Sequence, residues 1–307
     1  MKKILVLAFD SERNPDLLLK QLEKIQGIKK QSVFKSVNKL GAAIRKLHMK
    51  SIIPGKSLWY GNWKYKIDNF DALICIASQY SPDVLEWVHQ KNSKIRIINY
   101  FWDEIHVSGY PVKHSGAYEN WSFCLENCNE YDLKFNPQFY NPDIVLEKKE
   151  ILYDAIFVGA DRGGKWKTRT KSVKEFYDLC KRKQINAYIS YYSKAENIPQ
   201  EIKSERYLES AEYYCKTAQS LCVVDFVDVN FPWNTLRPLL ALSNGKKLIT
   251  NNKRIKDEPY YLKDNIFILG LDNENDLKQF IDSPFKNYDK AVLEYFRYDK
   301  WIERFFK

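Results

Sequence analysis

The fold is decided by residues 153–165, which read YDAIFVGADRGGK. Tyr153–Val158 has the length and apolar character of a buried strand, and a glycine-rich loop breaks it at Gly159–Gly164. A basic stretch with helical spacing follows, with Val173, Phe176 and Cys180 on its apolar side. Strand, loop and helix in this order are typical of a βαβ unit. Because the pattern begins anew in the middle of the chain, it predicts a second α/β domain.

The first half of the chain shows the same rhythm. Ile4–Phe9 reads as a buried first strand, followed by a loop and a helical pattern. An Asn- and Pro-rich stretch and the charged run 147–150 mark the domain boundary near residue 148. Further strands are expected at 72–77, 95–100, 187–190, 221–226, 247–250 and 266–269, and helices at 33–50, with Leu40, Ile44 and Leu47 on one face, and at 207–218. The sequence therefore predicts an α/β protein with two Rossmann-like domains facing a cleft, at 1–148 and 149–307.

The C-terminal segment 288–307 has apolar residues at helical spacing, with charged residues between them. We expect a helix that packs back toward the N-terminal domain. The alternative is a helix lying on a membrane surface, because the segment is aromatic and basic.

The composition favours anionic partners. The 307 residues include 49 Lys and Arg against 39 Asp and Glu, a net charge of +10. The basic residues are scattered, and no zinc-finger or RNP-like motif is present, which disfavours nucleic acid. The apolar run at the start is shorter than a signal-peptide core, and no run reaches the ~18 residues of a membrane span. We expect a cytoplasmic protein with six reduced cysteines.

The glycine-rich loop is the first candidate phosphate-binding element. Gly159 and Gly163 let the backbone approach a ligand, while Arg162 and Lys165 supply positive charge. The alternative is a tight turn with a solvated basic rim.

The second candidate element is residues 234–252, NTLRPLLALSNGKKLITNN. It predicts a loop, a short helix and a strand that ends in polar residues, including Asn251. Arg237 falls in the first turn of the helix, where the helix dipole disfavours a cation. A diphosphate would hold Arg237 there, with Thr235 donating its hydroxyl. The alternative is a salt bridge from Arg237 to Asp225 or Asp228.

Together these two elements resemble the bacterial lipopolysaccharide and capsular polysaccharide glycosyltransferases of the GT-B type. In that group a strand ending F-V-G-x-D-(K/R)-G-R opens the C-terminal domain. A block T-L-R-P-x-E-A-L-x-x-G-K-K-L-I-T-N-N forms much of the sugar-nucleotide site. Residues 100–105, 121–123 and 131–140 resemble the N-terminal half of the group. Leu240 stands where the group has a Glu that commonly holds the donor ribose, and Cys124 stands where it has an Asp.

The resemblance implies transfer of a sugar from a nucleotide-sugar to a cell-surface polysaccharide or lipid-linked acceptor, with no cofactor. It also implies a protein with peripheral contact to the anionic cytoplasmic face of the membrane. An inverting enzyme needs a base on the N-terminal domain. The candidates are Asp10, after the first strand, and Asp103, Glu104 and His106, after the strand at 95–100. Asp10 can instead cap a helix, His106 can be an ordinary surface residue, and a retaining enzyme needs no such base.

No D-x-D motif of the metal-dependent transferases is present. We therefore expect a metal-independent reaction, with Arg, Lys and helix dipoles meeting the charge of the leaving diphosphate. Two other readings stay open: another nucleotide-sugar enzyme of epimerase-like or phosphorylase-like type, and a non-catalytic GT-B protein, which Leu240 suggests.

Overall fold

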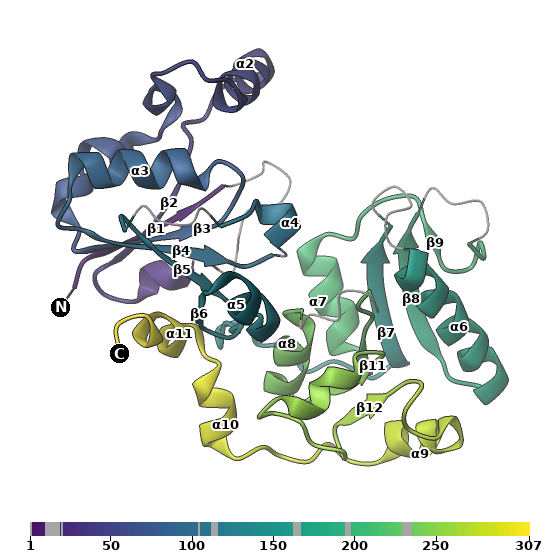
Figure 1. Ribbon diagram of the computed structural model, residues 1–307. Helices are drawn as coiled ribbons and strands as arrows, with labels where there is room; N and C mark the ends of the chain where they lie inside the picture. The colour runs from purple at the N-terminus through teal and green to yellow at the C-terminus, as the bar shows by residue number, and fades with distance from the viewer. Residues whose placement is uncertain are drawn as a thin grey trace. The chain divides into compact units, whose positions relative to one another are not determined.

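The computed structural model describes residues 2–9, 19, 21–103, 105–111, 116–161, 167–193, 198–228 and 235–307. The chain forms two compact units, which Figure 1 shows from purple to yellow along the sequence. Unit 1 contains Met1–Pro137 and Trp301–Lys307, and unit 2 contains Gln138–Lys300. The chain thus leaves unit 1 just before Gln138, ahead of the charged run 147–150, and its last residues return to unit 1.

Unit 1 is built on a parallel sheet of six strands in the order β2-β1-β3-β4-β5-β6. The strands are β1 (Ile4–Ala8), β2 (Ile28–Ser32), β3 (Ala72–Ile76), β4 (Arg96–Phe101), β5 (Glu119–Ser122) and β6 (Lys134–Phe135). The expected strands at 4–9, 72–77 and 95–100 are confirmed. Sequence patterns missed β2, β5 and β6, because they are short or carry few apolar residues.

The helices of unit 1 are α2 (Lys39–Lys50), α3 (Ser81–Lys91), α4 (Ile105–Ser108) and α5 (Leu125–Tyr131), with 3-10 turns η1 (Gln21–Lys24), η2 (Lys56–Trp59), η3 (Asn62–Tyr65) and η4 (Ile67–Asn69). The helix expected over 33–50 begins only at Lys39. Asn38 sets this start, because its side-chain oxygen accepts a hydrogen bond from the Gly41 amide at 2.8 Å. Leu40, Ile44 and Leu47 share one face, as predicted, and that face is exposed.

The end of the chain packs into unit 1, as predicted. In α11 (Tyr298–Arg304), the buried ring of Trp301 lies 5.0 Å from the ring of Tyr100. Asn136 joins the same contact, donating to the Trp301 carbonyl at 3.1 Å and accepting from Arg304 Nε at 2.7 Å. Trp301 and Phe305 thus lie in the core of unit 1, as the first alternative expects, while residues 288–300 of the segment belong to unit 2.

The segment is two short helices rather than one continuous helix. α10 (Lys290–Tyr295) ends before α11 begins, and Tyr140 lies beside the break. The Tyr140 amide donates to the Phe296 carbonyl at 2.8 Å, and the Tyr298 amide donates to the Tyr140 carbonyl at 3.0 Å. The helical ladder stops here because these backbone groups bond to Tyr140 instead.

Unit 2 contains a second parallel six-stranded sheet, in the order β12-β11-β10-β7-β8-β9. Its elements are β7 (Tyr153–Ala160), α6 (Lys167–Lys183), β8 (Ala187–Tyr192), β9 (Lys203–Ser204), α7 (Ser210–Ala218), β10 (Ser220–Asp225), α8 (Arg237–Ser243), β11 (Lys247–Thr250), η5 (Lys253–Asp257), β12 (Ile266–Ile268), η6 (Glu274–Asp276) and α9 (Leu277–Asp282). The strands expected in this half are confirmed at β7, β8, β10, β11 and β12, and β9 is additional.

Both faces of the second sheet are covered. Phe157 and Val224 point to the face packed by α6 and α9, while their neighbours Ile156 and Val223 point to the face packed by α8. This burial on both faces explains the continuous apolar runs of the central strands. Two such units, each a parallel sheet with helices, confirm the predicted pair of Rossmann-like domains. Within the described residues, no helix has the length and apolar character to cross a bilayer.

Lysine ammonium groups close helix ends at the amino edge of the second sheet. Lys246 donates to the carbonyls of Ala218, at 2.8 Å, and Ser220, at 2.7 Å, just after α7. Lys247, the first residue of β11, donates to the carbonyls of Phe280 and Ser283 at the end of α9. Burial lowers the pKa of both lysines. Lys246 and Lys247 of the 234–252 block therefore hold the ends of α7 and α9 in place. They do so at the amino edge of the sheet, opposite to the carboxyl ends of the strands.

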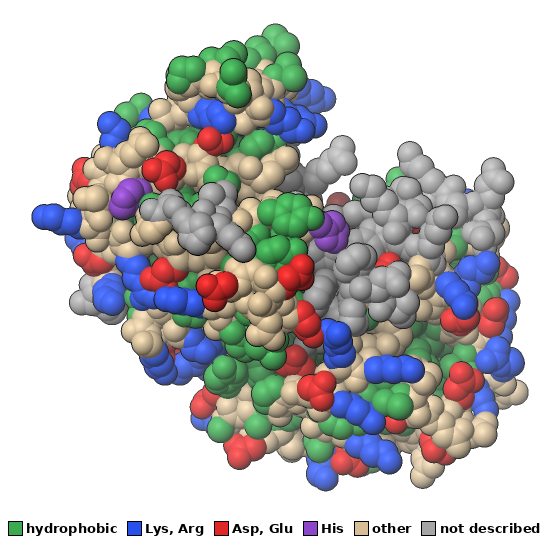
Figure 2. All heavy atoms as spheres, viewed as in Figure 1, with side chains coloured by type: hydrophobic (Ala, Val, Ile, Leu, Met, Phe, Trp, Pro, Cys, Tyr) green, Lys and Arg blue, Asp and Glu red, His purple; other side chains and the backbone are tan. Residues whose placement is uncertain are grey.

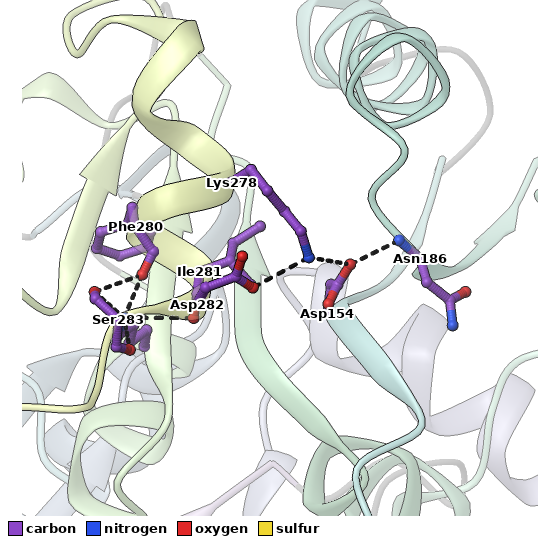
Figure 3. Close-up of polar contacts among 8 residues, drawn as sticks. Asp154, Asn186, Lys278, Phe280, Ile281, Asp282 and Ser283 are labelled. Atoms are coloured by element: carbon purple, nitrogen blue, oxygen red, sulfur yellow. Dashed lines mark hydrogen bonds and ion pairs between the residues drawn. The ribbon is translucent and has the colours of Figure 1, made fainter.

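Figure 3 shows a second lysine contact at this edge, from α9 to β7. Lys278 lies between two carboxylates, with its ammonium 3.3 Å from Asp154 and 3.1 Å from Asp282. Asp154 also accepts from the Asn186 amide at 2.9 Å, directly before β8. This network joins α9 to the starts of two strands.

In unit 1, Glu119 joins the starts of three neighbouring strands. It accepts from Arg96 at 2.6 and 2.9 Å and from Lys134 at 2.8 Å. Trp121 adds an indole hydrogen bond at 3.1 Å. Burial raises the pKa of Glu119, but the hydrogen bonds and charges of Arg96 and Lys134 outweigh it and lower the pKa to about 2.

We predict that Glu119→Gln lowers the free energy of unfolding by about 1–2 kcal/mol at pH 7, a figure reduced for partial solvent exposure. The folded-state pKa is depressed, so this stabilisation is complete above the ordinary value of 4.5 and disappears as the pH falls toward 2. Urea unfolding of both proteins between pH 7 and pH 3 measures the difference. Glu86→Gln, at an exposed site on α3, is the control. A difference that stays constant down to pH 3 would contradict the expectation.

Candidate functional site

Asp225, the last residue of β10, is the centre of a polar cluster in unit 2. Its side chain is only 2% exposed, and both of its oxygens are hydrogen-bonded. Arg237 donates to Oδ1 at 2.9 Å, and the Thr235 hydroxyl donates to Oδ2 at 2.9 Å. A buried carboxylate needs such partners, because an unpaired charge in this position is costly.

Arg237 is the first residue of α8 and reaches a second strand. Its other terminal nitrogen donates to the Val158 carbonyl of β7 at 2.8 Å. The Arg237 amide donates to the Thr235 hydroxyl at 3.2 Å, which shapes the turn into the helix. The salt bridge to Asp225, given above as one of two alternatives, is thus present, and it offsets the unfavourable helix dipole at this position.

Arg237 stays charged, and part of its side chain is exposed. Burial opposes the charged form, but Asp225 and Tyr213 together raise the Arg237 pKa. About a quarter of the side chain, 24%, is exposed. The hydrogen bonds to Asp225 and to the Val158 carbonyl use two of the five guanidinium N–H groups, and the exposed part of the side chain can meet an anion.

Gly159 has a packing role beside this cluster. A Cβ atom at this position would lie 2.7 Å from Cζ of Phe157, whose ring is buried. The Phe157 ring cannot move aside, because it packs in the core and lies beneath the guanidinium groups of Arg237, at 5.7 Å, and Arg169, at 5.8 Å. Of the other residues proposed for this loop, Arg162, Gly163 and Lys165 lie outside the described residues.

Asn251, directly after β11, holds the chain that follows β10. Its side-chain oxygen accepts from the Val227 amide at 2.9 Å, and its nitrogen donates to the Val227 carbonyl at 3.0 Å. The same nitrogen donates to Ser172 of α6 at 3.2 Å. Asn251 therefore positions the segment that leaves Asp225, and its amide is engaged with protein groups.

The proposed catalytic residues belong to unit 1. Asp103 and His106 both lie just after β4, at the carboxyl end of that strand, and both are exposed. Asp10 and Glu104 lie outside the described residues. The structure thus brings Thr235 and Arg237 together around Asp225 in unit 2 and places Asp103 and His106 near each other in unit 1.

Sequence reasoning did not single out Tyr213 and Ser172. Tyr213 lies on α7, where burial raises its pKa and Arg237 lowers it. Ser172 contacts Asn251 from α6. Neither residue belongs to a motif, and each reaches its partner, Arg237 or Asn251, only because of how its helix packs on the sheet.

A cavity of about 450 Å³ lies on the α6 side of unit 2, near the ends of β10, β11 and β12. Three carboxylates and one guanidinium line it, and Arg182 pairs with Glu274 at 3.7 Å. The excess of carboxylates opposes a diphosphate and suits groups that donate hydrogen bonds. The lining residues are Ser172, Glu175, Phe176, Asp178, Leu179, Arg182, Phe226, Asn251, Leu269, Gly270 and Glu274.

Cys124 and Leu240, the two residues that differ from the pattern of the resembling group, have different structural roles. Cys124 caps α5, accepting from the Asn127 amide at 3.4 Å and donating to Glu126 at 3.1 Å. Burial raises its pKa to about 12, so the group stays a neutral thiol. Cys124 therefore caps the helix as an Asp would. Leu240 is half-buried on α8, and an apolar side chain there has no group to bind a ribose hydroxyl.

Comparisons with solved structures show glycosyltransferases of the GT-B fold. A glycosyltransferase from Rickettsia africae ESF-5 matches with a TM-score of 0.57 and 13% identity, over 99% of this chain and 97% of that chain. The lipopolysaccharide outer core galactosyltransferase WaaB, in its apo form, matches with a TM-score of 0.52 and 15% identity, over 98% and 97%. HepE of Anabaena, in complex with UDP and glucose, matches with a TM-score of 0.50 and 10% identity, over 99% and 98%.

No protein-family model matches the chain, and no curated protein matches it. At these identities the structural likeness shows the fold, which is GT-B.

We predict strong coupling between Asp225 and Arg237 in folding. Either Asp225→Asn or Arg237→Gln alone leaves a buried group without its charged partner and should lower the free energy of unfolding by about 3 kcal/mol. The double variant should lose at least about 1 kcal/mol less than the sum of the two. Urea unfolding of all four proteins measures this coupling.

The matched control is the exposed pair of Arg206 and Glu212, whose side chains are 63% and 35% exposed. Its double-mutant cycle should give a coupling of under about 0.5 kcal/mol, as for other surface pairs. Strictly additive losses at Asp225 and Arg237 would show that the salt bridge does not anchor the cluster.

Proposed function

We propose that the protein is a glycosyltransferase that moves a sugar from a nucleotide-sugar donor to a cell-surface polysaccharide or lipid-linked acceptor. The observation that carries this proposal is the Asp225–Arg237–Thr235 cluster at the carboxyl ends of β7 and β10. In open parallel sheets, ligands bind outside the carboxyl ends of the strands where the strand order reverses. β7 and β10 are the neighbouring strands from which unit 2 extends in both directions.

The cluster suits a leaving diphosphate. Asp225 and the Val158 carbonyl hold the Arg237 guanidinium in a fixed orientation, so little ordering is needed when an anion arrives. The proposed site includes Thr235, Arg237 and Asn251, with Gly159, Arg162, Gly163 and Lys165 of the preceding loop. In this site Asn251 acts through the Val227 backbone that it holds.

The proposed catalytic groups are carboxylates or the histidine of unit 1. For an inverting reaction, one of Asp10, Asp103, Glu104 and His106 would accept the proton of the acceptor hydroxyl as its oxygen attacks the anomeric carbon. Asp103 and His106 are both exposed. A retaining reaction needs no such base.

The proposal places the protein in the cytoplasm, in peripheral contact with an anionic membrane where a lipid-linked acceptor would lie. The net charge of +10 supports such a contact. Nucleic acid is not proposed as a partner.

Arg237→Lys separates the ligand-binding role of the arginine from its role in folding. Lysine keeps a positive charge for Asp225 but loses the planar fork. We expect nucleoside diphosphates to bind about 10- to 150-fold more weakly, the effect of losing one charge-assisted hydrogen bond. Calorimetric titration of UDP and GDP measures the affinity, and circular dichroism checks the fold.

Arg206→Lys, at an exposed site in the same unit, is the control and should leave nucleotide affinity unchanged. A folded Arg237→Lys protein that binds both nucleotides as tightly as the original would make Arg237 purely structural. The diphosphate site would then lie elsewhere.

The reaction is proposed to need neither a metal ion nor a cofactor. We predict that sugar release from the preferred member of a UDP-, GDP- and CMP-sugar panel persists in excess EDTA, because cationic side chains meet the diphosphate charge. Chromatography of the released nucleotide gives the rate. Loss of activity in EDTA, with recovery on adding manganese or magnesium, would refute metal independence.

A second candidate is a non-catalytic GT-B protein that stabilises an assembly. Leu240 favours it, since an apolar side chain stands where the resembling group has its ribose-binding Glu. Thermal unfolding with UDP, GDP and CMP distinguishes the two, because a ligand of the native state raises the melting temperature. A rise with any of these nucleotides favours the enzyme, and no rise with all three favours the scaffold.

A further inference from the structure

Helix α2 turns its apolar side outward. Leu40, Ile44 and Leu47 are 70%, 49% and 72% exposed. Their spacing of four and then three residues aligns them along one side of the helix. A helix of a globular protein normally turns such a stripe toward the core. The inverted arrangement therefore needs an explanation.

The orientation of α2 is fixed by contacts on its other side. Met49 is buried, and His48 Nδ1 lies 2.8 Å from the indole nitrogen of Trp59, which donates to it. Arg45 donates to the Lys35 carbonyl at 3.1 Å, and its guanidinium lies over the Phe34 ring at 4.7 Å. The helix is thus anchored through polar and aromatic side chains. Its exposed stripe is a consequence of this anchoring.

The apolar surface continues past the helix. Ile52 is fully exposed, and Ile53 and Leu58 are 60% and 58% exposed. His48 keeps this segment against α2, because its Nε2 lies 3.3 Å from the Ile53 carbonyl. Figure 1 shows α2 standing out from the sheet of unit 1 beyond α3, and Figure 2 shows hydrophobic side chains gathered at that end with Lys and Arg beside them. We call Leu40, Ile44, Leu47, Ile52, Ile53 and Leu58 the α2 surface.

The charged residues in the segment that carries the α2 surface are all Lys and Arg. Residues 24–67 contain eleven Lys and Arg and no Asp or Glu, so this segment alone carries +11, more than the +10 of the whole chain. Lys39, Lys46 and Lys50 are exposed and lie along one flank of the apolar stripe. Lys56 is paired with Asp83 at 2.8 Å, so its charge already has a partner within the protein. The other basic residues are Lys24, Lys29, Lys30, Lys35, Arg45, Lys64 and Lys66.

We propose that the α2 surface docks on an anionic lipid bilayer. Exposed Leu and Ile side chains enter the boundary between headgroups and acyl chains, while the flanking lysines meet lipid phosphates. A helix that lies at the boundary of the bilayer accommodates both its exposed apolar side chains and its flanking lysines. A second copy of this chain would bring like charge against like charge. The proposal stands on α2 alone and does not depend on transferase activity.

Vesicle sedimentation of the full chain tests the proposal. Phosphatidylglycerol–phosphatidylcholine vesicles should bind the protein, more weakly as salt rises, and pure phosphatidylcholine should bind it poorly. Lys39→Gln, Lys46→Gln and Lys50→Gln together should lower the partition coefficient on the order of 100-fold at low salt. Leu40→Ser, Ile44→Ser and Leu47→Ser together should lower it by at least about tenfold.

Two control variants carry changes of the same kind at exposed sites of unit 2: two apolar residues become Ser in one, and three lysines become Gln in the other. They are Val145→Ser with Leu271→Ser, and Lys253→Gln with Lys256→Gln and Lys263→Gln. Each should bind vesicles within about twofold of the unchanged protein. All substitutions are at the surface, and unchanged circular dichroism and melting temperature establish that the variants fold.

Three results would overturn the proposal: no binding to anionic vesicles, equal losses in the α2 and unit 2 lysine variants, or a lipid-free dimer that the serine variant dissociates. The last result would assign the surface to a second copy of the chain. Vesicle binding lost only in the α2 variants, by a protein that binds no nucleotide, would support the docking surface while contradicting the proposed transferase.

Discussion

The buried carboxylate of Asp225 is the constraint on which the site in unit 2 depends. It ends β10 below the surface of the molecule and therefore requires a cation, which Arg237 supplies. The guanidinium also reaches the carbonyl of Val158, so one ion pair joins β10, β7 and the first turn of α8. A cation at that turn is unfavourable on its own and is stabilised by the same carboxylate. The ion pair that fixes the orientation of the Arg237 guanidinium is thus one that folding already requires.

The sequence predicts the central strands because their burial on both faces leaves a continuous apolar run. β1, β3, β4, β7 and β10 are of this kind, and all were identified. β2, β5, β6 and β9 are short or partly polar and give no such signal. The apolar spacing of the C-terminal segment predicted its return to the first unit, but local patterns did not give the residue at which the chain leaves that unit, just before Gln138. They also did not identify Tyr100 as the partner of Trp301, because the two residues are about two hundred positions apart in sequence.

The sequence predicted several residues of the candidate site but not the contacts that those residues make. The position of Arg237 in a first helical turn indicated that an anion must be near, and Asp225 was one of the anions considered. Distances were needed to show that Asp225 is the partner in the folded chain. Within the 234–252 block, Lys246, Lys247 and Asn251 bind the protein's own backbone. Resemblance to a sugar-nucleotide site does not separate residues that touch a ligand from residues that hold the site in shape.

Two amphipathic segments show what periodicity leaves undecided. The spacing of apolar residues predicts a helix at 33–50 and helical structure near 288–306, but it does not say which way each apolar side turns. Near the C-terminus, Trp301 and Phe305 are large rings that fill a core, and acidic residues lie between the basic ones. Around α2 there is no acidic residue from 24 to 67, and the apolar side chains are aliphatic and exposed. Acidic residues would repel an anionic surface. Their absence beside an outward apolar stripe therefore distinguishes α2, the helix proposed to face lipid, from the C-terminal segment that packs in a core.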